Sequence, residues 1–361
     1  MDLSEIAAKV EDGIRLNEAE AVYLLQSPDL LTVGELAFKA NRRLHGDNVY
    51  FNLNRHINYT NLCVNNCAFC AFRREEGEAG GYALNLEEVA VRAAEAAAAG
   101  ATEVHVVGGL HPDLPLEFYE RMLRTIRDAG PKLHIKAFTA VELQHFAAIS
   151  DRPLDEVIDR LQTAGLQSLP GGGAEVFAER ARRQLCPEKI SGARWLETMR
   201  TVHRAGLRSN ATLLFGHLET LEERVDHLAR LRSLQDETGG FQAFVALPFQ
   251  DVGTRLKGVR GPGGVDILKT LAVARLFLDN ILHIKAYWVM LGVKLAQVAL
   301  AFGVNDLDGT VVEEQIGHQA GAASPQALSR RGLVRLIHHA GRTPVERDSL
   351  YRELKREQGG C

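Results

Sequence analysis

The sequence lacks an excess of charge of either sign and has few aromatic residues. Of its 361 residues, 42 are Lys or Arg and 46 are Asp or Glu, so the formal net charge is -4, and 6% are aromatic. Proteins that bind nucleic acids usually carry a clear basic excess or a basic stripe, because they neutralise phosphates. We therefore expect no nucleic-acid partner.

The sequence also lacks a long uninterrupted hydrophobic run. The first ten residues include the charged Asp2 and Lys9, and the most apolar stretch, residues 287–304, contains Lys294 and Gln297. A signal peptide needs an apolar segment near the N-terminus, and a membrane-spanning helix needs about 20 mainly apolar residues. We therefore expect a cytoplasmic protein that does not enter a membrane.

Cysteine is scarce and unevenly placed. Three of the five cysteines, Cys63, Cys67 and Cys70, lie within eight residues of one another. An odd number with this clustering does not resemble the disulfide framework of a secreted domain, and a chain of this length can bury a large core without disulfides. We expect reduced thiols with a local purpose. Cys186 and Cys361 have no ligand spacing and are expected to take no part in it.

Short apolar runs alternate with helical patterns from residue 49 onward. This alternation predicts βαβ units around a parallel sheet. Eight alternations in about 260 residues match the size of an α/β fold of the (β/α)8 TIM type. The predicted strands are Val49–Ile57, Glu103–Val107, Leu133–Phe138, Gln167–Leu169, Ser209–Phe215, Gln242–Leu247, His283–Trp288 and Val304–Leu307.

Helical patterns flank the predicted barrel on both sides. We expect an N-terminal helical extension over residues 1–46, the barrel over residues 47–310, and a helical closing segment over residues 311–361. The flanking helices are predicted at Leu3–Val10, Glu18–Gln26, Leu30–Leu44, Leu333–His339 and Arg347–Lys355.

The cysteine cluster has the spacing C-x3-C-x2-C and directly follows the first predicted strand. Active sites of parallel barrels assemble at the carboxyl ends of the strands, and thiolates select zinc, copper(I) or iron–sulfur clusters. Three thiolates can hold a four-iron cluster and leave one iron open to a ligand. A structural zinc site is the alternative, but such sites usually have four protein ligands, and His56 would have to be the fourth.

This spacing, with Phe69 just before the last cysteine, resembles the radical S-adenosylmethionine (SAM) superfamily. The resemblance implies that Cys63, Cys67 and Cys70 bind a four-iron–four-sulfur (4Fe-4S) cluster, that SAM binds the open iron, and that Phe69 packs near the adenine. It also implies that an electron from the reduced cluster cleaves SAM. A donor such as flavodoxin or ferredoxin is therefore an expected partner.

Further segments resemble the aminofutalosine synthase family of the futalosine route to menaquinone. The resemblance implies that SAM is consumed as a co-substrate, and that its adenosyl carbon adds to the aryl enol-ether dicarboxylate 3-(1-carboxyvinyloxy)benzoate to form 6-amino-6-deoxyfutalosine. The related dehypoxanthine futalosine cyclases and deazaflavin synthases share several of these segments and remain alternatives, and a zinc-stabilised binding module is an alternative of another class. The supporting segments are Asn54–Asn61, Val107–Pro112, Lys136–Glu142, Leu169–Glu175, Gly216–Thr220 and Asn305–Thr310.

Glycines follow two of the predicted strands. Gly108 and Gly109 come after the second strand, where the absence of Cβ lets the backbone approach a ligand. The resemblance implies that they receive the amino group of SAM, and a tight turn is the alternative. Gly172 and Glu175 follow the fourth strand and are expected beside the adenosine or the substrate, unless this segment is a plain flexible loop.

Thr139 and Glu142 follow the third predicted strand. We expect them to bind the ribose hydroxyls or the ammonium group of SAM. Thr-x-x-Glu before a helix equally predicts a capping box, in which the two side chains bond to the first turn of the helix.

Polar residues occupy alternate positions in several predicted strands. Because side chains alternate between the faces of a strand, Asn54, His56, Lys136, Lys285 and Tyr287 are predicted to point into the barrel. A substrate with two carboxylates needs cations or donors there, so these residues are predicted to bind it. The alternative is that the lysines extend to solvent at the strand ends.

The remaining candidates lie in the segments that carry the resemblance. Asn305 and Asp306 are predicted to bind substrate. His217 and Glu219, at the end of the fifth strand, are predicted acid–base groups. A hydrogen-bonded structural histidine is the alternative for His217.

Overall fold

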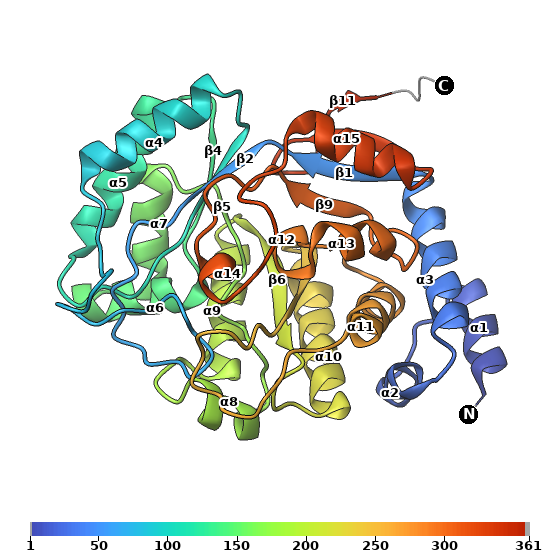
Figure 1. Ribbon diagram of the computed structural model, residues 1–361. Coiled ribbons are helices and arrows are strands. Elements are labelled where there is room, and N and C mark those ends of the chain that lie inside the picture. The colour runs from blue at the N-terminus through green and yellow to red at the C-terminus, as the bar shows by residue number, and fades with distance from the viewer. Residues whose placement is uncertain (1, 358–361) are drawn as a thin grey trace.

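The computed structural model describes residues 2–357, in which strands alternate with helices that surround them (Figure 1). The strands are β1 (Asn48–Asn52), β2 (Asn54–Ile57), β3 (Glu103–Val106), β4 (His134–Ala137), β5 (Ser168–Leu169), β6 (Arg208–Phe215), β7 (Phe241–Pro248), β8 (His283–Lys285), β9 (Asp306–Gly309), β10 (Thr343–Arg347) and β11 (Glu353–Arg356). The helices are α1 (Leu3–Glu11), α2 (Glu18–Gln26), α3 (Leu30–His45), α4 (Leu86–Ala98), α5 (Leu116–Ala129), α6 (Ala140–Ser150), α7 (Leu154–Ala164), α8 (Glu179–Leu185), α9 (Gly192–Arg204), α10 (Leu221–Thr238), α11 (Gly264–Phe277), α12 (Trp288–Leu291), α13 (Val293–Ala299), α14 (Ile316–Gln319) and α15 (Arg330–His339).

The barrel closes at strands β1 and β2, which follow each other in the chain with only Leu53 between them. β1 pairs with β9 and β2 pairs with β3, both in parallel, and the sheet order runs β1-β9-β8-β7-β6-β5-β4-β3-β2. Because β1 and β2 are consecutive in the chain, the two ends of this order meet. The His56 N–H donates to the Val312 carbonyl at 2.8 Å across the junction. The expected TIM-type barrel is confirmed.

The structure adjusts three of the predicted strands. The first is divided into β1 and β2, because its two halves pair with different neighbours. The seventh ends at Lys285, and α12 begins at Trp288, whose indole N–H donates to the Gly309 carbonyl at 2.9 Å. The eighth is Asp306–Gly309 rather than Val304–Leu307.

The prediction of a helix at residues 347–355 is wrong. β10 pairs in parallel with β1, and β11 pairs with β10 in an antiparallel manner. This pairing depends on the edge of β1, far away in the sequence, so local periodicity does not reveal it. Helix α15 agrees with the predicted Leu333–His339. The division of the chain at residues 46 and 310 stays a prediction.

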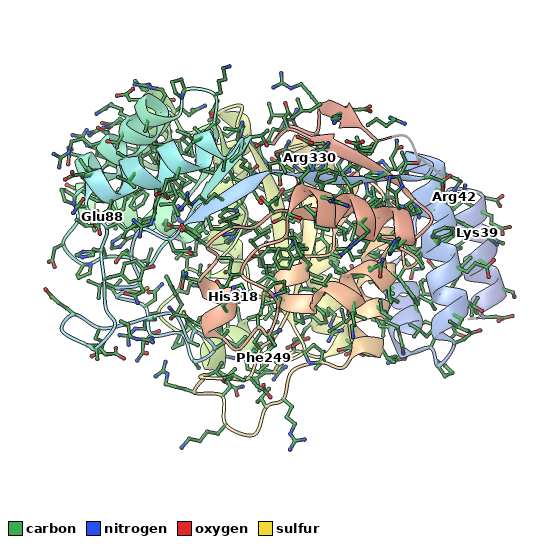
Figure 2. All side chains as sticks on the ribbon, turned by 45° about the horizontal axis from the view of Figure 1, so that its top comes forward. Lys39, Arg42, Glu88, Phe249, His318 and Arg330 are labelled. Atoms are coloured by element: carbon green, nitrogen blue, oxygen red, sulfur yellow. The ribbon has the colours of Figure 1, made fainter. Side chains whose placement is uncertain are left out.

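The N-terminal helices form where the sequence predicts them. α2 and α3 pack against α11, and apolar residues of all three N-terminal helices join the main core (Figure 1). Charged side chains of both signs, such as Lys39, Arg42 and Glu88, stand on the outer surface (Figure 2). None of the helices between residues 2 and 357 has the length and apolar character needed to span a bilayer.

The segment after β5 passes so close to β6 that it requires glycine. Gly171 has φ +80°, and a Cβ there would lie 1.9 Å from the carbonyl oxygen of Asn210. The Thr212 hydroxyl donates to the Gly171 carbonyl at 2.9 Å. Gly173 has φ +82°, and its Cβ would lie 2.5 Å from Val141. The segment is therefore anchored against the barrel rather than being a plain loop.

We expect Gly171→Ala to lower the free energy of unfolding by about 2 kcal/mol or more, because it combines left-handed backbone strain with a backbone clash. Gly206→Ala is the matched control, since Gly206 has φ +83° but nothing within 4 Å of the added Cβ. That variant should lose only about 1 kcal/mol. Denaturant unfolding of both variants beside the parent measures the difference. Equal losses would show that the approach to Asn210 does not explain the glycine.

Candidate active site

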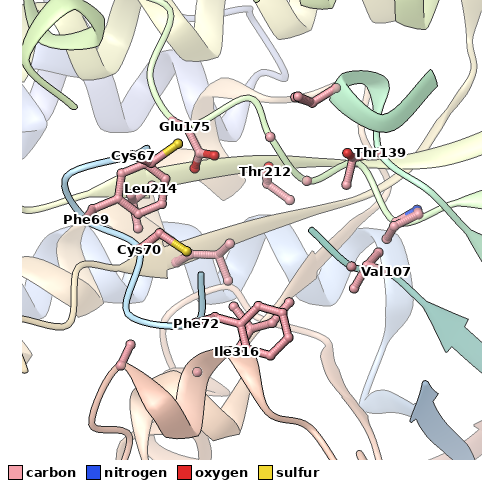
Figure 3. Close-up of a pocket in the computed structure, with 18 of the residues that line it drawn as sticks. Cys67, Phe69, Cys70, Phe72, Val107, Thr139, Glu175, Thr212, Leu214 and Ile316 are labelled. Carbon is pink, nitrogen blue, oxygen red and sulfur yellow. The ribbon is translucent and has the colours of Figure 1, made fainter. Parts of the chain in front are cut away.

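A cavity of about 330 Å³ lies at the carboxyl ends of the barrel strands, the place where parallel barrels carry their active sites. It is lined by side chains from β6 and from the segments after β2, β3, β4, β5, β7, β8 and β9. Figure 3 shows Cys67, Phe69 and Cys70 on one side of it and Val107 and Thr139 on the other. The cavity has the volume of a small-molecule site.

All three clustered cysteines line this cavity. Backbone hydrogen bonds shape their loop: Cys63 N–H donates to Arg74 O at 3.2 Å, and Cys70 N–H donates to Cys67 O at 3.2 Å. Ala68 N–H donates to Leu185 O at 2.7 Å, which ties the loop to the end of α8. The protein therefore holds the three thiols in a defined loop at the cavity wall.

The donor set fits a four-iron cluster. Burial raises the pKa of Cys67 to about 12 and also raises that of Cys70, so these thiols favour ionisation only when a bound cation compensates the charge. Within residues 2–357 no three Cys, His, Asp or Glu side chains converge as the ligands of a single ion would. In a four-iron cluster each cysteine binds its own iron, so convergence on one point is not required.

The other cysteines and the zinc alternative find no support in this geometry. Cys186 is buried and does not line the cavity, and Cys361 lies outside the described residues. His56, the fourth ligand that a zinc site would need, stacks on His105 deeper in the barrel.

Lys189 lies beside the cysteine loop, although no motif in the sequence points to it. Its Nζ donates to Glu175 Oε1 at 2.6 Å and lies 5.3 Å from the centre of the Phe69 ring. Burial opposes its positive charge, but the neighbouring Cys67 thiol and Glu175 carboxylate raise the pKa of Lys189. The predicted cofactor residues Phe69 and Glu175 therefore share one cation at the cavity wall.

Gly108 and Gly109 bring the end of β3 directly against the cysteine loop. A Cβ on Gly108 would lie 2.7 Å from the Tyr59 ring, and one on Gly109 would lie 2.2 Å from the Leu62 carbonyl oxygen. The Gly109 N–H donates to Thr60 O at 2.8 Å. Close packing alone thus requires both glycines. Both also line the cavity, so their predicted contact with SAM stays a prediction.

Thr139 and Glu142 form the capping box at the start of α6. Glu142 Oε2 accepts from Thr139 N–H at 2.6 Å, and its Oε1 accepts from the Tyr59 hydroxyl at 2.8 Å and from Gly108 N–H at 3.2 Å. Burial raises the pKa of Glu142. The carboxylate thus links three segments around the cavity. Thr139, Glu142 and Gly172 all line it, and their role as ligands of SAM stays a prediction.

The floor of the cavity is a layer of polar side chains from adjacent strands. His56, His105 and Lys136 occupy directly paired positions of β2, β3 and β4. Tyr287 and Asp308 line the cavity with them. No motif of the sequence points to His105, although strand alternation places it on the same face as Glu103.

Lys136 at the cavity floor and Lys285 outside the cavity lining each have a carboxylate of the protein as their partner. Lys136 Nζ donates to Glu103 at 2.5 Å, and Lys285 Nζ donates to Asp308 at 2.5 Å. Burial disfavours the charged carboxylates, but the lysines hold the pKa values of Glu103 and Asp308 well below the usual range. Both lysines point inward and neither reaches solvent. Their predicted binding of substrate carboxylates stays a prediction, which this pairing does not favour.

Four of the predicted substrate residues do not line the cavity: Asn54, Lys285, Asn305 and Asp306. Asn54 Oδ1 accepts from the Val311 N–H at 2.7 Å, which helps close the barrel. Asn305 Oδ1 accepts from Arg275 at 3.0 Å, and Asp306 Oδ2 accepts from Arg347 at 2.8 Å. Asn54, Asn305 and Asp306 thus bond to groups within the barrel framework, and their binding of substrate stays a prediction that these contacts do not favour.

His217 and Glu219 also lie outside the cavity lining. Glu219 accepts from the Gly216 and His217 N–H groups at 2.6 and 3.0 Å and from Arg224 at 2.8 Å. Burial would raise the pKa of Glu219, but its hydrogen bonds and Arg224 hold it at about 2. These contacts fix the turn after β6. The acid–base role of His217 and Glu219 stays a prediction, which this structural role does not favour.

Comparison with known proteins agrees with this site. A family model of the radical SAM superfamily matches residues 57–231, and a model of the CofH/MqnC C-terminal region matches residues 238–358. The chain is 47% identical to the aminodeoxyfutalosine synthase of Thermus thermophilus, over 98% of this chain and 96% of that protein. It is 40% identical to the 5-amino-6-(D-ribitylamino)uracil–L-tyrosine 4-hydroxyphenyl transferase of Methanopyrus kandleri, over 94% of each chain.

A solved structure supports the fold. The crystal structure of methylornithine synthase (PylB) superposes with a TM-score of 0.75 at 19% identity, and the match covers 94% of this chain and 97% of that one. The cysteine loop, the barrel and the matches over nearly the whole chain lead to one conclusion. The chain belongs to the radical SAM superfamily, within the group that includes the aminodeoxyfutalosine synthases and the 4-hydroxyphenyl transferases, and is an enzyme that uses a 4Fe-4S cluster and SAM.

Proposed function

We propose that the chain is an aminofutalosine synthase of menaquinone biosynthesis. It joins the 5'-deoxyadenosyl group of SAM to 3-(1-carboxyvinyloxy)benzoate, consumes one water, and yields 6-amino-6-deoxyfutalosine with release of methionine and bicarbonate. The observation that carries this proposal is the higher identity to a synthase than to a tyrosine transferase over nearly the same length. The cysteine-lined cavity at the barrel mouth supports it.

The cluster and SAM, when bound, supply a carbon-centred radical, and the protein supplies position and shielding. Cys63, Cys67 and Cys70 would hold the cluster at one side of the cavity. Apolar side chains, among them Phe72, Val107, Leu214 and Ile316, form much of the remaining wall (Figure 3). They hold the alkene near the adenosyl carbon and keep out water, which raises the effective concentration of the reacting carbons.

The segment after β9 contributes part of this wall. Glu314 accepts from the Gly317 N–H at 2.8 Å and from His318 Nδ1 at 3.0 Å, and these bonds fix α14 beside the cavity. Figure 2 locates His318 on α14. The hydrogen bond that His318 donates to the Glu314 carboxylate raises the pKa of His318 to about 9, so the pair is ionic at neutral pH and keeps Ile316 in place.

The chemistry implies the partners. We expect an aryl enol-ether dicarboxylate as substrate and a low-potential one-electron donor, such as flavodoxin or ferredoxin, as reductant. The three cysteines are needed as thiolates, so we place the enzyme in the reducing cytoplasm.

The fate of the adenosyl carbon tests the proposal. Holoenzyme given reductant, the enol ether and SAM with a carbon label in the adenosyl group is expected to place the label in the major product, as read by mass spectrometry. Release of the label as free 5'-deoxyadenosine would instead indicate hydrogen abstraction, as in a dehypoxanthine futalosine cyclase. Turnover of tyrosine with 5-amino-6-(D-ribitylamino)uracil, without turnover of the enol ether, would indicate the transferase activity.

The cluster ligands make a separate prediction. Cys63→Ala, Cys67→Ala and Cys70→Ala should each lose the cluster and reduce SAM cleavage to background, because the other two thiolates cannot hold the cluster alone. Cys186→Ala is the matched control, since Cys186 is also buried but lies off the cavity. It should keep about four irons per chain, with sulfide. A retained cluster in a variant of the three, together with its loss in the Cys186 variant, would contradict the assignment.

A further inference from the structure

Two histidines at the floor of the cavity form a contact that the cofactor site does not explain. The rings of His56 and His105 are stacked, with centroids 4.3 Å apart and planes within 8° of parallel. His56 is only 4% exposed, yet its Nε2 has no hydrogen-bond partner among the described residues. Buried polar atoms nearly always have a partner, so this nitrogen points to a ligand.

The charged side chains around the His56–His105 pair neutralise one another, without a contribution from the two histidines. Glu103, Lys136 and Asp308 lie near both imidazoles, and Glu314 lies near that of His56. Lys136 is bonded to Glu103, and Asp308 is bonded to Lys285. Glu314 accepts from His318, at the other side of the cavity wall. Among the described residues at this floor, every cation therefore already has an anion.

Without a bound anion, the His56–His105 pair is uncharged. Burial lowers the pKa of both imidazoles, and for His105 the neighbouring His56 lowers it further. Two parallel imidazolium rings at this spacing would repel each other, so the pair can bind one added proton but not two. A bound anion supplies the favourable partner for that proton.

We propose that the His56–His105 pair binds the ring carboxylate of the substrate and takes up one proton from solvent as it does so. This inference rests on the proposed function for the chemical class of ligand, an aryl carboxylate. The orientation follows from the barrel: the reacting double bond must lie near the cysteine loop, so the other end of the molecule reaches the deeper floor. A carboxylate on an imidazolium forms a charge-assisted hydrogen bond, which suits a buried floor.

Proton uptake gives binding a defined dependence on pH. Above the pKa of the empty pair, affinity should fall by about tenfold for each pH unit, because each bound carboxylate then needs a proton from a solution with fewer of them. The affinity stops falling once the pH exceeds the pKa of the pair in the complex. A neutral amide in place of the ring carboxylate should bind without this slope.

Calorimetry on the holoenzyme with SAM, without reductant, measures the proton directly. Titration with 3-(1-carboxyvinyloxy)benzoate and with 3-methoxybenzoate, in buffers of different ionisation enthalpy, should give uptake of about one proton per ligand. 3-Methoxybenzamide should give none. The simpler benzoate keeps the measurement independent of which reaction the enzyme catalyses.

The variants assign the proton to the pair. His56→Gln and His105→Gln should abolish the uptake and weaken binding of both benzoates by roughly 10- to 100-fold, the effect of losing a charge-assisted hydrogen bond. His339→Gln, at an exposed position of α15, is the control and should match the parent. Unchanged iron content and unchanged SAM cleavage without substrate confirm that the two variants are folded.

The outcomes separate this inference from the proposed function. Absence of proton uptake in the parent enzyme, no binding of either benzoate, or uptake that survives in both glutamine variants would overturn the assignment, even where the labelled adduct is formed. Uptake that depends on both histidines supports it, even where the labelling experiment indicates another reaction.

Discussion

Charge compensation between strands is the constraint on which the site depends. A TIM-type barrel is usually filled with branched apolar side chains. Here the interior instead carries the pairs Lys136–Glu103, Lys285–Asp308 and Arg347–Asp306. Such pairs add little net stability over apolar packing, but a broken pair leaves a buried charge without a partner. The ion pairs therefore hold their side chains in fixed positions. The polar layer that they form is short and leaves the cavity above it open for ligands.

The cavity consequently has two ends of different chemistry. At its mouth, thiols, glycine backbone and the Glu175–Lys189 pair surround the place for the cofactor. At its floor, the imidazoles of His56 and His105 and the phenol of Tyr287 offer hydrogen bonds and carry no net charge. Apolar side chains separate the two. A molecule with a reactive alkene at one end and an anionic ring at the other matches this division, and neither end alone would select it.

Local signals in the sequence were sufficient for most of the framework. The capping box at Thr139, the helical patterns of the N-terminal segment and the spacing of the cysteines act over a few residues, so they can be read directly. Features that depend on distant partners could not be read in this way. The Glu175–Lys189 pair and the stacking of His105 on His56 arise only when separate segments of the chain come together. The strand β10 belongs to this second group, because its partner is β1.

That pairing of β10 with β1 also has a consequence for how the chain folds during synthesis. Arg342, just before β10, donates to the carbonyl of Asp47, just before β1, across a separation of 295 residues. Until those residues have left the ribosome, β1 presents an unpaired edge, and such edges readily pair with strands of other chains. Long-range pairing of this kind also forms slowly. A chain that ends shortly before β10 therefore leaves this edge of β1 open to pairing with other chains.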